Sequence, residues 1–383
     1  LGLVLKGMGI TVTGSDMNAS ASTRELEEAG IPVSIGHRSE NVEGAACVIR
    51  TAAAHNDNPE IAAAMAAGIP VFERAEAWGA IMKGYKNALC ISGTHGKTTT
   101  TSMCTHIFMA AQLDPTVMIG GTLPLLGAGH RVGSGETIIL ESCEYCNSFL
   151  SFFPTVAIIL NVEADHLDFF KDLDDVEHSF RAFADLVPES GMIVANCEDE
   201  NTMKALEGEE RPMITFGVES GDIWAENLEF YYGLGRFDVV YHGRKYAHIE
   251  LSVPGMHNVK NALAAALCAA LSGIPSNVIV QALSRFEGAA RRLQYRGTHA
   301  GVRYYDDYAH HPTEIVATLS ALRMLCGKEG RLFAVFQPHT YTRTKALFDD
   351  FVKVLSGVDR VIITDIYAAR EADVFGVSSE GLV

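Results

Sequence analysis

The sequence lacks any apolar run of the roughly 20 residues that a bilayer-spanning helix needs, and no signal peptide opens it. It is also short of positive charge, because 30 lysines and arginines face 47 aspartates and glutamates and leave a net charge of −17. A field of that sign repels the phosphates of nucleic acids. We therefore expect no membrane insertion, and no nucleic-acid partner unless one face is locally basic.

The eight cysteines form no disulfide framework, since they are scattered along the chain and several lie in apolar segments. This distribution is typical of reduced thiols in a cytoplasmic protein. Cys143 and Cys146 form a lone C-x-x-C pair, and a zinc site would need two further ligands nearby. We interpret this pair as a coincidence of a binding-site loop.

Strands and helices alternate along the 383 residues, which are enough for two or three domains. We expect an α/β protein with domains at residues 1–82, 83–288 and 289–383. The chain starts without Met, inside an expected helix, and stops without a convincing last element, so we expect both ends to be truncated. A strand is expected at residues 10–13, followed by Asp16, which in a dinucleotide-binding fold would meet a ribose hydroxyl.

A glycine-containing loop follows an apolar strand expected at residues 88–92 and leads into helix-forming sequence. Glycines let backbone N–H groups turn toward phosphates, and a helix N-terminus adds positive potential. Lys97 is expected to bridge the β- and γ-phosphates of ATP, and the Thr98 hydroxyl to ligate Mg²⁺. The predicted phosphate site comprises Gly93, Thr94, His95, Gly96, Lys97, Thr98 and Thr99.

Two further strands end in acidic sequence. Residues 137–140 lead into Glu141, with Glu144 a weaker candidate, and residues 156–160 lead into a segment with three acids and His166. Strand ends of α/β sheets carry ligands, so Glu141 and His166 are predicted to hold magnesium beside Thr98. Alternatively, Glu141 could be an exposed charge at a strand end, and His166 an ordinary surface histidine.

The remaining polar pairs support more than one interpretation. Asn258 and Asn261 share a helix face and could present amides to a purine, or Asn258 could simply cap the helix. Arg292 lies beside Arg291 at an expected domain junction. The two could bind a ligand there, or they could simply form a solvated basic pair. Asp307 follows a strand expected at residues 302–305, at an edge where ligands bind. His310 and His311 precede Pro312 and could be ordinary helix-start residues.

These motifs, taken in order along the whole chain, resemble the Mur ligase family of ATP-dependent peptidoglycan precursor synthetases. The matching segments are residues 93–99, 161–168, 255–261, 291–292, 306–314 and 336–343. The resemblance implies a Rossmann-like N-terminal domain for a UDP-sugar, a central P-loop ATPase domain and a Rossmann-like C-terminal domain. It implies the cytoplasm as location and a monomer or weak homodimer.

The resemblance also implies roles for individual residues. Lys97, Thr98, Glu141 and His166 would serve ATP and Mg²⁺, with Asn258 and Asn261 near the adenine. Arg292 would contact phosphates, and Asp307 the ribose. The substrate-binding positions would be Asp16, Tyr308, His339 and Arg343, and His310 or His311 would act as a base.

The H-H-P-T-E and F-Q-P-H segments indicate the branch of the family that adds L-alanine to the lactyl carboxylate of UDP-N-acetylmuramate through an acyl phosphate. The alternative within the family adds a preformed peptide to the same UDP-sugar. Outside it, the alternatives are a nicotinamide oxidoreductase, suggested by the N-terminal pattern, and a nucleotide-dependent binding protein without turnover.

Overall fold

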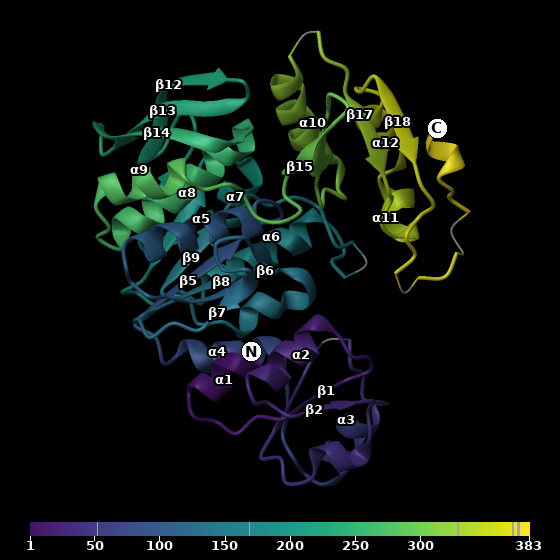
Figure 1. Cartoon of the computed structure of the whole chain (residues 1–383). Coiled ribbons are helices and arrows are strands. Elements are labelled where there is room, and N and C mark those ends of the chain that lie inside the picture. The colour runs from purple at the N-terminus through teal and green to yellow at the C-terminus, as the bar shows by residue number, and fades with distance from the viewer. Residues whose placement is uncertain (52, 168, 328, 370, 374–375) are drawn as a thin grey trace.

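The computed structural model describes the chain from Leu1 to Val383 except residues 52, 168, 328, 370 and 374–375. It has three α/β domains, with the central one between the other two (Figure 1). The expected three-domain α/β fold is confirmed. Among the described helices, none is both long enough and apolar enough to cross a membrane.

The N-terminal domain contains two pairs of parallel strands, β1 with β2 and β3 with β4. Its strands are β1 (Gly14–Asp16), β2 (Val33–Ile35), β3 (Val48–Arg50) and β4 (Val71–Glu73). Its helices are α1 (Gly2–Gly7), α2 (Ala21–Glu28), the 3₁₀ turn η1 (Ser39–Val42), α3 (Pro59–Ala66) and α4 (Arg74–Met82).

The prediction of a strand at residues 10–13 is wrong. Strand β1 begins only at Gly14, which is the first residue in register with β2, through Val33. Apolar residues upstream have no neighbouring strand to pair with, and Ile10 is accordingly 48% exposed. Asp16 is the last residue of β1, as the pattern predicted.

The central domain is built on a ten-stranded sheet in the order β14-β13-β12-β11-β10-β9-β5-β8-β6-β7. Its strands are β5 (Asn87–Ser92), β6 (Thr116–Leu123), β7 (Ala128–Arg131), β8 (Thr137–Glu141), β9 (Val156–Ile159), β10 (Met192–Asn196), β11 (Met213–Phe216), β12 (Ile223–Tyr231), β13 (Leu234–Tyr241) and β14 (Arg244–Pro254). The pairs from β6 through β12 are parallel, whereas β12 to β14, like β6 and β7, pair antiparallel.

Helices cover both faces of this sheet. They are α5 (Lys97–Ala110), the 3₁₀ segment η2 (Tyr145–Ser151), α6 (Leu173–Ala184), α7 (Glu200–Ala205), α8 (Met256–Leu271) and α9 (Ser276–Ser284). The alanines of α8 let it pack closely, and most of its residues are buried. Strand β5 lies between β8 and β9, so the loops after these three strands meet at one edge of the sheet.

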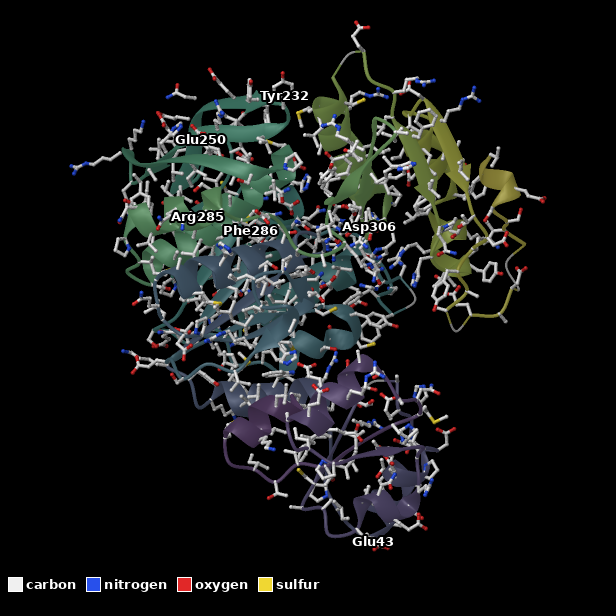
Figure 2. The ribbon with its side chains drawn as sticks, in the orientation of Figure 1. Glu43, Tyr232, Glu250, Arg285, Phe286 and Asp306 are labelled. Carbon is white, nitrogen blue, oxygen red and sulfur yellow. The ribbon has the colours of Figure 1, made fainter. Side chains whose placement is uncertain are left out.

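The C-terminal domain begins with an antiparallel pair, β15 (Gln294–His299) and β16 (Val302–Asp306). It continues with α10 (Pro312–Cys326), β17 (Phe333–Phe336), α11 (Tyr341–Ala346), α12 (Phe348–Leu355), β18 (Arg360–Ile363) and the 3₁₀ turn η3 (Glu380–Leu382). Its small core includes Phe336 and Phe351. Asp306, at the end of β16, lies where this domain faces the central one, far from Glu43 in the N-terminal domain (Figure 2).

Candidate active site

A cavity of ≈ 540 Å³ is lined by residues of the central and C-terminal domains. The central domain contributes the loops after β5, β8 and β9 and the start of α8. The C-terminal domain contributes the loop before α10, the first turns of α10, and residues around α11. The cavity therefore lies at the carboxyl edge of the parallel strands, where α/β proteins bind ligands.

The loop between β5 and α5 needs its glycines. Gly93 has φ +134°, and a Cβ there would lie 2.9 Å from the Cβ of Leu160. Gly96 caps α5 with φ +84°, and its Cβ would lie 2.7 Å from Oδ1 of Asn261. Backbone conformation and close approach thus both exclude larger residues, as in a loop that wraps a phosphate.

Lys97, the first residue of α5, lines the cavity and is held by the loop around it. Its Nζ donates to the carbonyls of Gly93 and Thr94 and lies 2.9 and 3.1 Å from the two carboxylate oxygens of Glu144. The Glu144 side chain is 2% exposed. Burial alone would lower the pKa of Lys97, but the Glu144 carboxylate raises it, so this lysine is cationic.

Thr98 and Glu141 meet beside Lys97. The Thr98 hydroxyl donates to Oε1 of Glu141 at 3.0 Å, and the other carboxylate oxygen accepts from the backbone N–H of Gly120 at 2.6 Å. Arg292, from the junction to the C-terminal domain, donates to the same hydroxyl at 3.2 Å. A hydroxyl and a carboxylate are hard oxygen ligands, so these residues fit Mg²⁺.

His166 lies beside Glu144, whereas the sequence paired it with Glu141 as a magnesium ligand. Its Nε2 is 3.9 Å from Oε1 of Glu144 and 3.9 Å from Oδ2 of Asp165. The ring packs against Tyr145, with centroids 4.6 Å apart, and the backbone has φ +54°. The loop thus holds this imidazole at the cavity, beside the weaker of the two acidic candidates.

The loop after β9 is paired to the phosphate loop through Asn161. Its Oδ1 accepts from the backbone N–H of His95 at 2.7 Å and its Nδ2 donates to the His95 carbonyl at 3.1 Å. The acids Glu163 and Asp165 of this loop line the cavity. Asp168, the last acid of the predicted cluster, lies outside the described residues.

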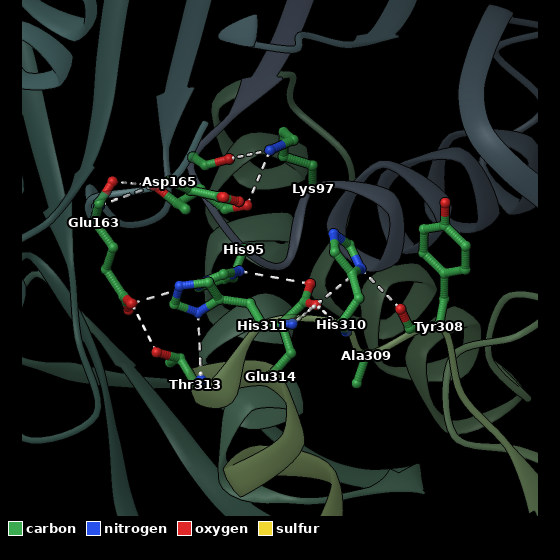
Figure 3. Close-up of polar contacts among 12 residues, drawn as sticks. His95, Lys97, Glu163, Asp165, Tyr308, Ala309, His310, His311, Thr313 and Glu314 are labelled. Carbon is green, nitrogen blue, oxygen red and sulfur yellow. Dashed lines mark hydrogen bonds and ion pairs between the residues drawn. The ribbon is translucent and has the colours of Figure 1, made fainter. Parts of the chain in front are cut away.

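The His95 ring lies between carboxylates of two domains (Figure 3). Its Nε2 is 3.4 Å from Glu163 and its Nδ1 is 3.5 Å from Glu314, in the first turn of α10. Burial alone would lower the pKa of His95, but the two carboxylates raise it to about 9. Thr313 strengthens the same contact by donating to Glu163 at 2.8 Å.

The C-terminal side of the cavity carries a polar group made of Tyr308, His310, His339 and Arg343. Arg343 donates to Asp165 of the central domain at 3.2 Å. Nδ1 of His310 lies 2.9 Å from the carbonyl oxygen of Tyr308, and burial lowers the pKa of this histidine. His311 lies deeper, caps α10 through its Nδ1, and is not among the cavity-lining residues.

The residues predicted for the nucleotide also line the cavity. Asn258 donates to the carbonyl of Pro254 at 2.7 Å and accepts from Asn261 at 3.3 Å, so it does not cap α8. Asp307 accepts from the backbone N–H groups of Leu293 and Ala309 at 2.6 and 2.7 Å. Burial raises the pKa of Asp307.

The structure thus brings together all predicted site residues except one. Gly93 and His311 contact the cavity-lining residues without being among them, whereas Asp16 lies apart, exposed at the end of β1. Sequence reasoning ranked Glu144 only as a weaker candidate and assigned no individual role to Asn161, Glu163, Asp165 and Glu314. The acidic segment after β9 and the H-H-P-T-E motif contained a signal for most of these.

Three family models match successive parts of the chain. Residues 1–86 match the model "Mur ligase family, catalytic domain", and residues 91–269 match "Mur ligase middle domain". Residues 291–380 match "Mur ligase, glutamate ligase domain".

Similar proteins agree with these matches. UDP-N-acetylmuramate–L-alanine ligase of Caldicellulosiruptor bescii is 47% identical over 100% of this chain and 84% of its own length, and that of Clostridium perfringens is 46% identical over 100% and 83%. The crystal structure of UDP-N-acetylmuramate-alanine ligase from Thermotoga maritima matches with a TM-score of 0.80 and 30% identity, covering 96% of this chain and 82% of that one. A murein peptide ligase from Psychrobacter arcticus has the same fold, with a TM-score of 0.73 and 23% identity over 94% and 92% of the two chains.

Proposed function

The chain belongs to the Mur ligase family, and from that premise we propose how its residues carry out its reaction, the ATP-dependent ligation of L-alanine to UDP-N-acetylmuramate in peptidoglycan synthesis. The observation that carries the proposal is that one cavity is lined both by Lys97, Thr98 and Glu141 of the central domain and by Tyr308, His310 and Arg343 of the C-terminal domain. Phosphoryl-transfer groups and groups suited to a small amino acid thus meet in one space.

In the first step the lactyl carboxylate attacks the γ-phosphorus of ATP, and ADP leaves. Lys97 neutralises charge on the transferring phosphoryl oxygens, and the backbone N–H groups of the phosphate loop hold the neighbouring phosphates. Arg292 contacts Thr98 and is placed to bind a phosphate as well. Asn258 and Asn261 bind the adenine, and Asp307 the ribose.

Thr98 and Glu141 hold Mg²⁺ in this proposal, with His166 as a further ligand. Their oxygen donors suit this hard cation. Bound there, Mg²⁺ would neutralise charge on the phosphate oxygens. The protein's own part is to orient these oxygens, which Gly120 does by donating to Glu141.

In the second step the amine of L-alanine attacks the acyl phosphate, and phosphate leaves. The amine must be neutral to attack, so a base is needed. We assign that role to His310, because it borders the cavity and its lowered pKa keeps it unprotonated near neutral pH. Arg343, Tyr308 and His339 bind the carboxylates of the two substrates, while Asp16 contacts the UDP-sugar in the N-terminal domain.

Phosphate release from ATP tests this proposal. It should require both UDP-N-acetylmuramate and L-alanine, with glycine and serine measured as comparison amines. Turnover with a preformed peptide in place of L-alanine would instead favour the peptide-adding alternative. ATP hydrolysis that ignores the UDP-sugar would contradict the acyl-phosphate step.

Two wider expectations belong to the same proposal. The requirement for ATP supports a cytoplasmic location. The chain is proposed to act as a monomer or weak homodimer, which sedimentation velocity at several concentrations would test.

A further inference from the structure

Three potential metal ligands outside the proposed magnesium site gather where the central and C-terminal domains meet. One ring nitrogen each of His95 and His311 and one carboxylate oxygen of Glu163 lie within 4.8 Å of one another. His95 comes from the phosphate loop, Glu163 from the loop after β9, and His311 from the cap of α10. The cluster therefore spans two domains.

From this arrangement we propose that His95, Glu163 and His311 form a binding site for a divalent transition-metal ion, Zn²⁺ or Co²⁺, which ties the C-terminal domain to the central domain. Two imidazoles and one carboxylate are the ligand set of borderline metals, whereas Mg²⁺ prefers oxygen. Three protein ligands also leave the fourth tetrahedral position open.

A bound ion would have to draw together ligand atoms that lie up to 4.8 Å apart. Ligands at 2.0–2.1 Å from a tetrahedral zinc lie about 3.4 Å apart. Nε2 of His95 and the carboxylate of Glu163 are already 3.4 Å apart. The rings of His95 and His311 have centroids 5.1 Å apart and are tilted by 38°, so both rings border the same space (Figure 3).

The polar atoms of this cluster are poorly satisfied by the protein itself. Nε2 of His311 is buried without a hydrogen-bond partner, and the ring nitrogens of His95 meet Glu163 and Glu314 only at 3.4 and 3.5 Å, without hydrogen-bond geometry. His311 is 6% exposed, and the bond that its Nδ1 accepts from the Thr313 N–H is long, at 3.4 Å. Buried polar atoms without partners are costly, and a metal ion would supply the missing partner.

Neighbouring residues form the outer layer that metal sites require. Glu314 lies 3.5 Å from Nδ1 of His95, which leaves Nε2 of that ring for the metal. Thr313 donates to Glu163 at 2.8 Å and fixes its carboxylate. Such partners orient ligands and raise their affinity. Thr98 and Glu141 are not part of the cluster, so Mg²⁺ and the second ion do not compete for residues.

Titration of the protein with Co²⁺ in excess Mg²⁺ tests the site, followed by visible absorption and equilibrium dialysis. We expect one Co²⁺ per chain with the intense bands of a four- or five-coordinate ion. His311→Gln and Glu163→Gln should each weaken binding by roughly tenfold or more, because each removes a ligand. His339→Gln, a histidine of the same cavity outside the cluster, should bind Co²⁺ like the parent.

Several outcomes would overturn the proposal. Parent-like Co²⁺ binding by both His311→Gln and Glu163→Gln would show that the ion lies elsewhere, as would loss of the bands in His166→Gln alone. No Co²⁺ binding in excess Mg²⁺ would show that a proton, shared between His95 and the two carboxylates, is the only occupant. Circular dichroism identifies any variant that fails to fold, and the other ligand variant then decides.

Discussion

Substituting Gly96 by alanine should loosen the contact between the phosphate loop and α8. Gly96 has φ +84°, where an L-residue costs about 1–2 kcal/mol. The new Cβ would also lie 2.7 Å from Oδ1 of Asn261, a buried side chain that has little room to move. Overpacking of this kind costs about 1–3 kcal/mol more, which gives a total of about 2–5 kcal/mol.

Gly273 provides the matched control. It has φ +75°, follows α8 in the same domain, and has nothing within 4 Å of the position of its Cβ. Gly273→Ala should therefore show the backbone cost without the steric one. The difference between the two variants isolates the contact with Asn261.

Urea unfolding and nucleotide affinity, measured on both variants, check the reasoning. Gly96→Ala should lose about 1–3 kcal/mol more unfolding free energy than Gly273→Ala, and should bind ATP more weakly. Adding Asn261→Ala to Gly96→Ala should recover part of the lost stability, since the clashing atom is gone. If Gly96→Ala is no more destabilised than Gly273→Ala, the close approach of loop and helix is refuted.

Three further predictions concern the chemistry. Lys97→Met should lower phosphate release by about 10²-fold or more, whereas Lys86→Met, an exposed lysine of the same domain, should leave the rate unchanged. Glu141→Gln should raise the Mg²⁺ concentration for half-maximal activity roughly tenfold or more, and an unchanged Mg²⁺ dependence would remove Glu141 from the metal site. Because burial lowers the pKa of His310, the acid limb of the parent pH–rate profile should lie below pH 6.5, and His310→Gln should lose that limb together with about 10²-fold in kcat.

The sequence predicted well those features that depend on local pattern. The phosphate loop was recognisable because its glycines, Lys97 and Thr98 lie between an apolar strand and a helix, and that context decides the backbone. Glu141 was recognisable as the acid that ends a buried strand.

What the sequence could not show depends on packing between distant segments. Glu141 and Glu144 are three residues apart, and only the fold decides that Glu144 turns to Lys97. Glu314 meets His95 because two domains pack against each other, and no local pattern encodes that contact. The misplaced first strand has the same origin, since pairing with β2, rather than hydrophobicity, sets where β1 begins.

The ion pair between Lys97 and Glu144 has a consequence for selectivity. Both oxygens of the carboxylate are already engaged by the ammonium group, so an incoming anion must outcompete an internal rival of full negative charge. A monovalent anion such as chloride offers no advantage over that rival, whereas a polyphosphate chain does. The pocket thus discriminates against weakly charged anions of the cell before any specific contact forms, and a competitive inhibitor aimed at this lysine would need more than one negative charge.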